Sequence, residues 1–168
     1  MLPEFPDLTI CKKCGHIFWL SKTKEIGTYS RGEEHDLLWE NADNASFLSI
    51  DEYFMALKMN VPKRKQKEFF IRQRIWWAFN DRVRNRKPLF NSEEDKSRWE
   101  SNIAAFIKIL DPEDVNQLIL IAELNRNLGN FDICLTIIES LTIPDIDWLK
   151  DAFIKKCSAK NQLVFQFS

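Results

Sequence analysis

The sequence predicts an all-α fold, a short solenoid of antiparallel helix pairs, preceded by a small β-hairpin at the N-terminus. From residue 49 onward, apolar residues recur at helical spacing behind helix-capping residues, such as Ser49 with Glu52 three positions later. Short turns join the last helices, which places neighbours antiparallel and is typical of helical repeats. Only four glycines occur in 168 residues, which argues against a fold built from tight hairpins.

Two domains are expected, residues 1–48 and residues 49–168. The first has prolines near its start, a cysteine-containing turn and the strand-like run "HIFWL" at 16–20, followed by a polar loop at 27–36. The second carries the helix signals. We therefore expect a hairpin element followed by five or six helices over about residues 49–158.

The first three helices have clear ends. Ser49 begins a helix over 51–59, and Val61-Pro62 stops it. A basic helix follows over about 64–86 and ends before Pro88. Ser92, with three acids directly after it, begins a helix that runs to about Leu110.

The remaining helices are shorter. Asp111-Pro112 predicts a capped helix start, and Gly129 predicts its left-handed end. A helix over 131–141 ends before Pro144, and Asp145 is a candidate cap for a last helix over 146–157. Residues 163–167, "LVFQF", predict a short terminal strand.

Residues 119–141, "ILIAELNRNLGNFDICLTIIESL", resemble one tetratricopeptide repeat. The matching positions are Ala122, Leu128-Gly129, Phe131-Asp132, Cys134 in the place of a usual alanine, Ile138 and Leu141. The usual tryptophan early in the first helix is absent. The resemblance implies a helix pair that crosses closely where Ala122 meets Cys134, and stacked pairs that form a concave surface for a protein or peptide.

The cysteine-containing turn near the N-terminus predicts a metal-binding site. Cys11 and Cys14 can chelate one ion with two thiolates, and Gly15 allows the positive φ that turns backbone N–H groups toward the sulfurs. "CKKCGH", residues 11–16, therefore resembles the first knuckle of a zinc ribbon. That resemblance implies zinc as cofactor, with Cys11 and Cys14 as ligands.

A complete zinc ribbon needs a second pair of ligands, and the sequence has no second Cys-x-x-Cys. The candidates in this chain are His16, His35, Cys134 and Cys157, of which His35 is better separated from Cys14 than His16 is. Two chains could instead contribute one cysteine pair each. The alternative is a ribbon that has lost its second knuckle and packs as a hairpin with free thiols. Cys134 itself is expected in the core of the repeat.

Residues 63–87 carry ten Lys or Arg against two acids, in a chain with a net charge of −1. Basic side chains between aromatic ones can bind single-stranded nucleic acid, and the arginines available for this are Arg72, Arg74, Arg82, Arg84 and Arg86. However, apolar residues fall on two sides of this helix at about 100° per residue. We therefore expect Trp76 and Phe79 to be buried, with the arginines pairing with acids or aromatic rings.

No catalytic arrangement is evident, because the chain has two histidines, no Gly-rich phosphate loop and no His-Glu-x-x-His. We expect a non-enzymatic protein-interaction module with a protein or peptide partner, and a nucleic-acid-associated protein is the alternative. No apolar run reaches about 18 residues, so no membrane partner is expected. The absence of an export signal and the cysteine spacing predict reduced thiols and a cytoplasmic location. The oligomeric state stays open.

Overall fold

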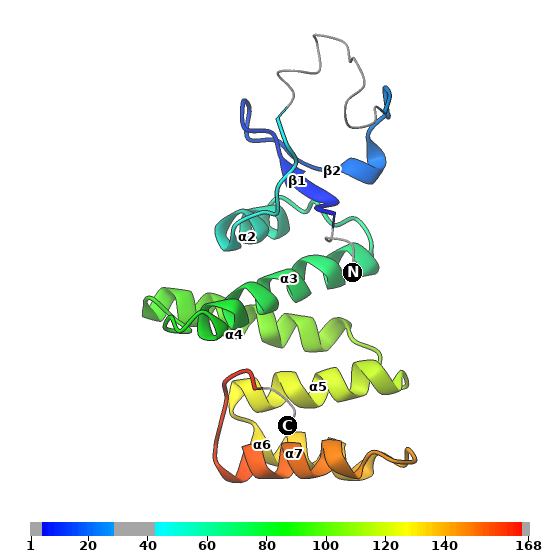
Figure 1. The fold of residues 1–168 in the computed structure, drawn as a ribbon, viewed down its shortest axis with the longest axis vertical. Coiled ribbons are helices and arrows are strands. Elements are labelled where there is room, and N and C mark those ends of the chain that lie inside the picture. The colour runs from blue at the N-terminus through cyan, green and yellow to red at the C-terminus, as the bar shows by residue number, and fades with distance from the viewer. Residues whose placement is uncertain (1–4, 29–42, 166–168) are drawn as a thin grey trace. The chain divides into compact units, whose positions relative to one another are not determined.

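The computed structural model describes residues 5–28 and 43–165. These residues form two compact units that divide between Val61 and Pro62. The predicted fold class is confirmed, because the described residues are mainly helical, with one two-stranded antiparallel sheet near the N-terminus (Figure 1). The expected boundary between independently folding domains at 48/49 stays a prediction. By its contacts, the first helix belongs with the hairpin. No helix in the described ranges is long and apolar enough to cross a membrane.

In the N-terminal unit, strands β1 (Leu8–Ile10) and β2 (Ile17–Trp19) pair antiparallel, with Thr9 opposite Phe18. A 3-10 turn, η1 (Leu20–Lys22), follows β2. The Thr9 hydroxyl donates to the Ser46 carbonyl oxygen at 3.0 Å, which ties the strand to the segment before the first helix.

Helix α2 (Ile50–Lys58) begins at the capping box read from the sequence. The Glu52 backbone N–H donates to the Ser49 hydroxyl, and the Ser49 N–H donates to the Glu52 carboxylate at 2.7 Å. These bonds satisfy two backbone donors that the start of a helix otherwise leaves unpaired.

The second unit contains five helices in its described residues, and each packs mainly against the next along the chain. They are α3 (Lys65–Arg84), α4 (Glu93–Ile109), α5 (Val115–Leu128), α6 (Phe131–Ser140) and α7 (Asp147–Ser158). In Figure 1 they follow one another from the green α3 to the orange α7, with α6 and α7 side by side. Contacts between sequence neighbours are what an antiparallel helical array requires.

Two parts of the unit's core hold these helices together. Between α3 and α4, Ile71, Ile75 and Phe79 are fully buried, and Phe69 meets Phe106 edge to face at 5.1 Å. Between α5, α6 and α7, one apolar cluster includes Ala122, Cys134, Ile138, Leu141, Ile146, Leu149, Phe153 and Cys157. Burial of such side chains stabilises the fold by about 1.5–3 kcal/mol for each large apolar group.

Three local expectations were wrong. Asp114, not Asp111, caps α5, since its carboxylate accepts from the backbone N–H groups of Asn116 and Gln117. Asp145 makes no cap for α7, because its backbone lies at φ 58 and Ile146 holds the cap position. Of the strand predicted over 163–167, residues 163–165 form none, since side chains of α5 bind this segment, and 166–167 lie outside the described residues.

Candidate functional site

The Cys11–His16 turn, which carries the predicted metal ligands, joins the two strands and is tight. Gly15 lies at φ +72, and its backbone N–H donates to the Cys11 carbonyl oxygen at 2.8 Å. The pKa of the Cys11 thiol is lowered, chiefly because the backbone N–H of Cys14 and then that of Lys13 donate to its sulfur. Cys11 is half-buried and Cys14 is exposed. The turn therefore favours the thiolate form that binds metals.

The other ligands proposed from the sequence do not gather around this turn. His16 is exposed, and its ring stacks on Phe18 with centroids 6.0 Å apart. His35 lies outside the described residues. Within residues 5–28 and 43–165, no three His, Cys, Asp or Glu side chains come together as a metal site would require. Of the proposed ligands, the described part of the chain places only Cys11 and Cys14 in this turn.

Cys134 and Cys157 belong to the helical core. Both are buried, and their thiols interact with each other across α6 and α7. Burial raises the pKa of both thiols, so they stay protonated and are poor nucleophiles and poor metal ligands. The expectation that Cys134 is a core residue is met, and Cys157 shares that role.

Three of the five arginines proposed for nucleic-acid binding make contacts within the fold. Arg72 is ion-paired with Glu68 at 2.7 Å, Arg74 lies over two aromatic rings, and Arg82 is ion-paired with Asp95. Arg82 also lies over the Phe79 ring at 4.5 Å. Each of the three is half-buried.

The other two arginines, Arg84 and Arg86, are exposed, and Arg84 forms a surface ion pair with Asp81. Of the two aromatic residues expected to be buried, Phe79 is fully buried. Trp76 is half-buried, and its indole N–H donates to the Asn127 side-chain oxygen at 2.8 Å. The basic helix is thus packed into the fold along most of its length, with its basic C-terminal end exposed.

A cavity of about 470 Å³ opens between alternate helices of the second unit. Its volume is in the range of small-molecule and peptide side-chain pockets. We call it the α3/α5/α7 groove, and it is lined by Trp76, Asn80, Arg84, Asn116, Ile119, Leu120, Glu123, Trp148, Leu149, Phe153, Val164 and Phe165.

On α3 and α5 the lining residues recur every three or four positions, and α7 contributes Trp148, Leu149 and Phe153. On α3 the row is Trp76, Asn80 and Arg84, which the sequence could have indicated by its spacing of four. On α7, Trp148 is 60% exposed although it is one of the bulkiest side chains in the chain. Sequence reasoning missed Asn80 and Trp148 as site residues, because nothing local shows that three helices bring these residues together.

One wall of the groove is the segment that follows α7, and a buried arginine holds it. Arg126 on α5 is 0% exposed, and its guanidinium binds both carboxylate oxygens of Glu123 at 2.8 and 2.6 Å. It also donates to the carbonyl oxygens of Asn161 and Leu163 and lies over the Phe165 ring at 4.8 Å. A buried guanidinium is tolerated because all of these acceptors surround it.

Asn127 completes this contact between α5 and the C-terminal segment. Its side-chain amide donates to the Gln162 carbonyl oxygen at 2.8 Å and accepts from Trp76 of α3. Gly129, at φ +83, leaves space for the Gln162 side chain, which a Cβ atom there would meet. Side chains of α5 therefore hold the backbone of residues 161–163, and Val164 and Phe165 continue into the groove.

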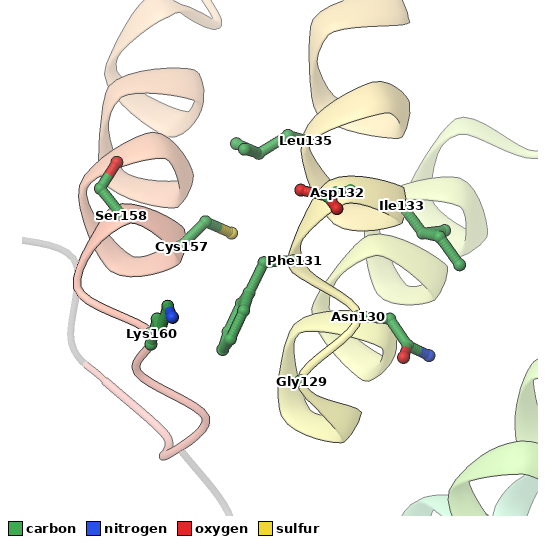
Figure 2. A pocket seen from close by; sticks show the side chains of 9 residues that line it. All are labelled: Gly129, Asn130, Phe131, Asp132, Ile133, Leu135, Cys157, Ser158 and Lys160. Carbon is green, nitrogen blue, oxygen red and sulfur yellow. The ribbon is translucent and has the colours of Figure 1, made fainter.

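A second cavity, of about 600 Å³, lies between the start of α6 and the end of α7 (Figure 2). Phe131 extends toward α7, and the Cys157 sulfur points toward α6. The lining residues include no histidine, and its one cysteine has the raised pKa already noted. The cysteine in this cavity is therefore a poor nucleophile.

In comparisons with known proteins, no family model, curated protein or solved structure matches the chain.

Proposed function

We propose that the helical unit is a non-enzymatic protein-interaction module that binds a segment of a partner protein in the α3/α5/α7 groove. One observation carries this proposal: residues from three alternate helices converge on one largely apolar cavity with an exposed tryptophan. Helical repeats commonly present such a surface along their concave side. The tetratricopeptide-like pattern at 119–141 supports the same architecture, and Ala122 and Cys134 are both fully buried in one cluster.

The test selects short random peptides, displayed on phage, against the full chain. We expect enriched peptides to bind Trp148→Ala about tenfold or more weakly, since a buried tryptophan contact is worth at least about 1.4 kcal/mol. Trp148 is exposed, so its truncation should leave the fold intact. Ile154→Ala is the control, because Ile154 is an exposed apolar residue of the same helix that lines neither cavity. No enrichment, or equal binding to both variants, would reject the proposal.

We also propose that the Cys11–His16 turn binds zinc, with Cys11 and Cys14 as ligands and either His35 or a second chain completing the site. The lowered pKa of Cys11 and the positive φ of Gly15 support this. When bound, zinc would hold the hairpin turn closed. Metal analysis of the purified full chain and of Cys14→Ser, with molecular mass measured alongside, tests it. One zinc per chain supports His35, one per two chains supports a dimer, and none in the wild type supports the degenerate ribbon.

Nucleic-acid binding is the competing function, and the exposed basic residues at the end of α3 are what favour it. A titration with single-stranded RNA at two salt concentrations distinguishes nucleic-acid binding from a function in protein interaction alone. Binding through phosphates should weaken by about 0.7 log units per log unit of salt for each phosphate contacted, and it should be lost when Arg84 and Arg86 become Glu. We expect no such binding even at low salt.

A further inference from the structure

Asn80, on the groove side of α3, is an unusual buried residue. It is 3% exposed and lines the α3/α5/α7 groove, yet its side-chain amide has no hydrogen bond to any residue within the described ranges. The other buried asparagines of this unit are all bonded: Asn102 to Arg72, Asn125 to Ile121, and Asn127 to Gln162. Buried polar groups in folded proteins nearly always have partners. Because the Asn80 amide lines the open groove, a bound ligand can replace the water that would otherwise satisfy it.

The chemistry of the amide limits what that partner can be. An asparagine side chain offers one acceptor and two donors in one plane. An extended peptide presents the complementary pair, a backbone C=O and a backbone N–H. A purely apolar ligand would leave the amide unsatisfied, at a cost.

Beside the groove, side chains of α5 hold a backbone segment of the chain itself. Successive carbonyl oxygens of Asn161, Gln162 and Leu163 accept from Arg126 and Asn127 on α5, and this segment then contributes Val164 and Phe165 to the wall. Side-chain donors of α5 thus already bind a backbone segment next to the groove, although they do not line it.

Charge and shape add two further features of the ligand. Trp76, Trp148 and Phe153 supply aromatic walls for bulky apolar side chains. At the other end of the α3 row, Arg84 lines the groove with half its side chain exposed, and Arg86 and Lys87 beyond it are exposed. Nearby Asp81 offsets one of these charges. Acidic residues on the ligand would complement the remainder.

We propose that the groove binds an extended peptide with bulky apolar side chains and an acidic flank, and that the Asn80 amide binds its backbone. This inference rests on the proposed protein-interaction function. Asn80 acts as a specificity-determining contact to the main chain, Trp148 and its neighbours receive the side chains, and Arg84 selects the acidic flank.

The test uses synthetic copies of the peptides that the wild-type chain enriches, each with one backbone N–H replaced by N-methyl. In the wild type, we expect methylation at one position to weaken binding about tenfold or more, as loss of a buried hydrogen bond would. In Asn80→Ala, methylation at that position should not weaken peptide binding any further. Asn91→Ala, an exposed asparagine outside the groove, should behave as the wild type does.

The possible outcomes distinguish a failure of this inference from a failure of the proposed protein-interaction function. If the peptides need Trp148 but bind Asn80→Ala as tightly as the wild type, the groove binds partners and the backbone contact is wrong. If enriched peptides have no acidic flank, or bind Arg84→Glu equally well, the charge preference is wrong. If no peptide depends on Trp148, both the inference and the proposed function fail.

Discussion

Arg126 and Glu123 form a bidentate ion pair inside the folded chain, with N–H···O distances of 2.8 and 2.6 Å and a guanidinium that is 0% exposed. The two residues are three positions apart on α5, so the helix itself places their side chains next to each other. The remaining donors of Arg126 then reach the carbonyl oxygens of the C-terminal segment. The pair therefore links a local helix contact to the closure of the groove wall.

Replacing Arg126 should destabilise the protein strongly. Arg126→Met leaves two carbonyl groups without this donor and Glu123 with only the longer bond from Asn127, and we expect the free energy of unfolding to fall by about 3–5 kcal/mol. Urea denaturation followed by circular dichroism measures this. Arg84→Met is the matched control, because the exposed Arg84–Asp81 pair contributes about 0–1 kcal/mol. Similar losses in the two variants would contradict the structural role given to Arg126.

Replacing each of two buried asparagines with leucine should change the free energy of unfolding in opposite directions. Asn80 has no partner among the described residues, so Asn80→Leu should raise the free energy of unfolding by about 1–2 kcal/mol. Asn102 exchanges hydrogen bonds with Arg72, so Asn102→Leu should lower it by about 1–3 kcal/mol. The comparison uses the same substitution at the same burial. Destabilisation at both sites would mean that Asn80 has a partner within the chain.

A larger side chain at Ala122 should disturb the contact between α5 and α6. Ala122 is fully buried in the cluster that includes Cys134, and Ala122→Phe should cost about 1–3 kcal/mol by overpacking. Ala104→Phe, on an exposed face of α4, tests the effect of the side chain alone and should change stability little. Thermal denaturation compares the melting temperatures of the two variants. An unchanged melting temperature for Ala122→Phe would contradict a close crossing of α5 and α6.

Asp95 should make stability depend on pH in the acid range. Desolvation raises the pKa of its carboxyl, but the Asn91 backbone N–H and the Arg82 guanidinium outweigh this, and the net pKa is lowered. A carboxyl with a lowered folded-state pKa stabilises above its unfolded value of about 3.9 and loses that contribution as pH falls through the folded value. Asp95→Asn should therefore be less stable than the wild type at pH 7, and the gap should close toward pH 2. A constant gap over this range would contradict the lowered pKa.

The sequence alone determined the helices and most of their ends. The Ser49 capping box, the Ser92 cap and the left-handed Gly129 are all read correctly, because each depends on residues within about four positions. The positive φ of Gly15 is local for the same reason. The cap of α5 was misplaced, since Asp111 and Asp114 are both plausible caps and only the turn between them decides.

Only the tertiary structure decided what the helices build together. The hydrogen bond from Trp76 to Asn127 spans 51 positions, and the bonds from Arg126 and Asn127 to the C-terminal segment span 35 to 37. No local pattern marks Arg126 as buried or Asn80 as unpartnered, because both properties depend on which distant helix lies alongside. Local hydrogen bonds fix helices residue by residue, whereas the groove exists only where α3, α5 and α7 are brought together by packing over the whole unit.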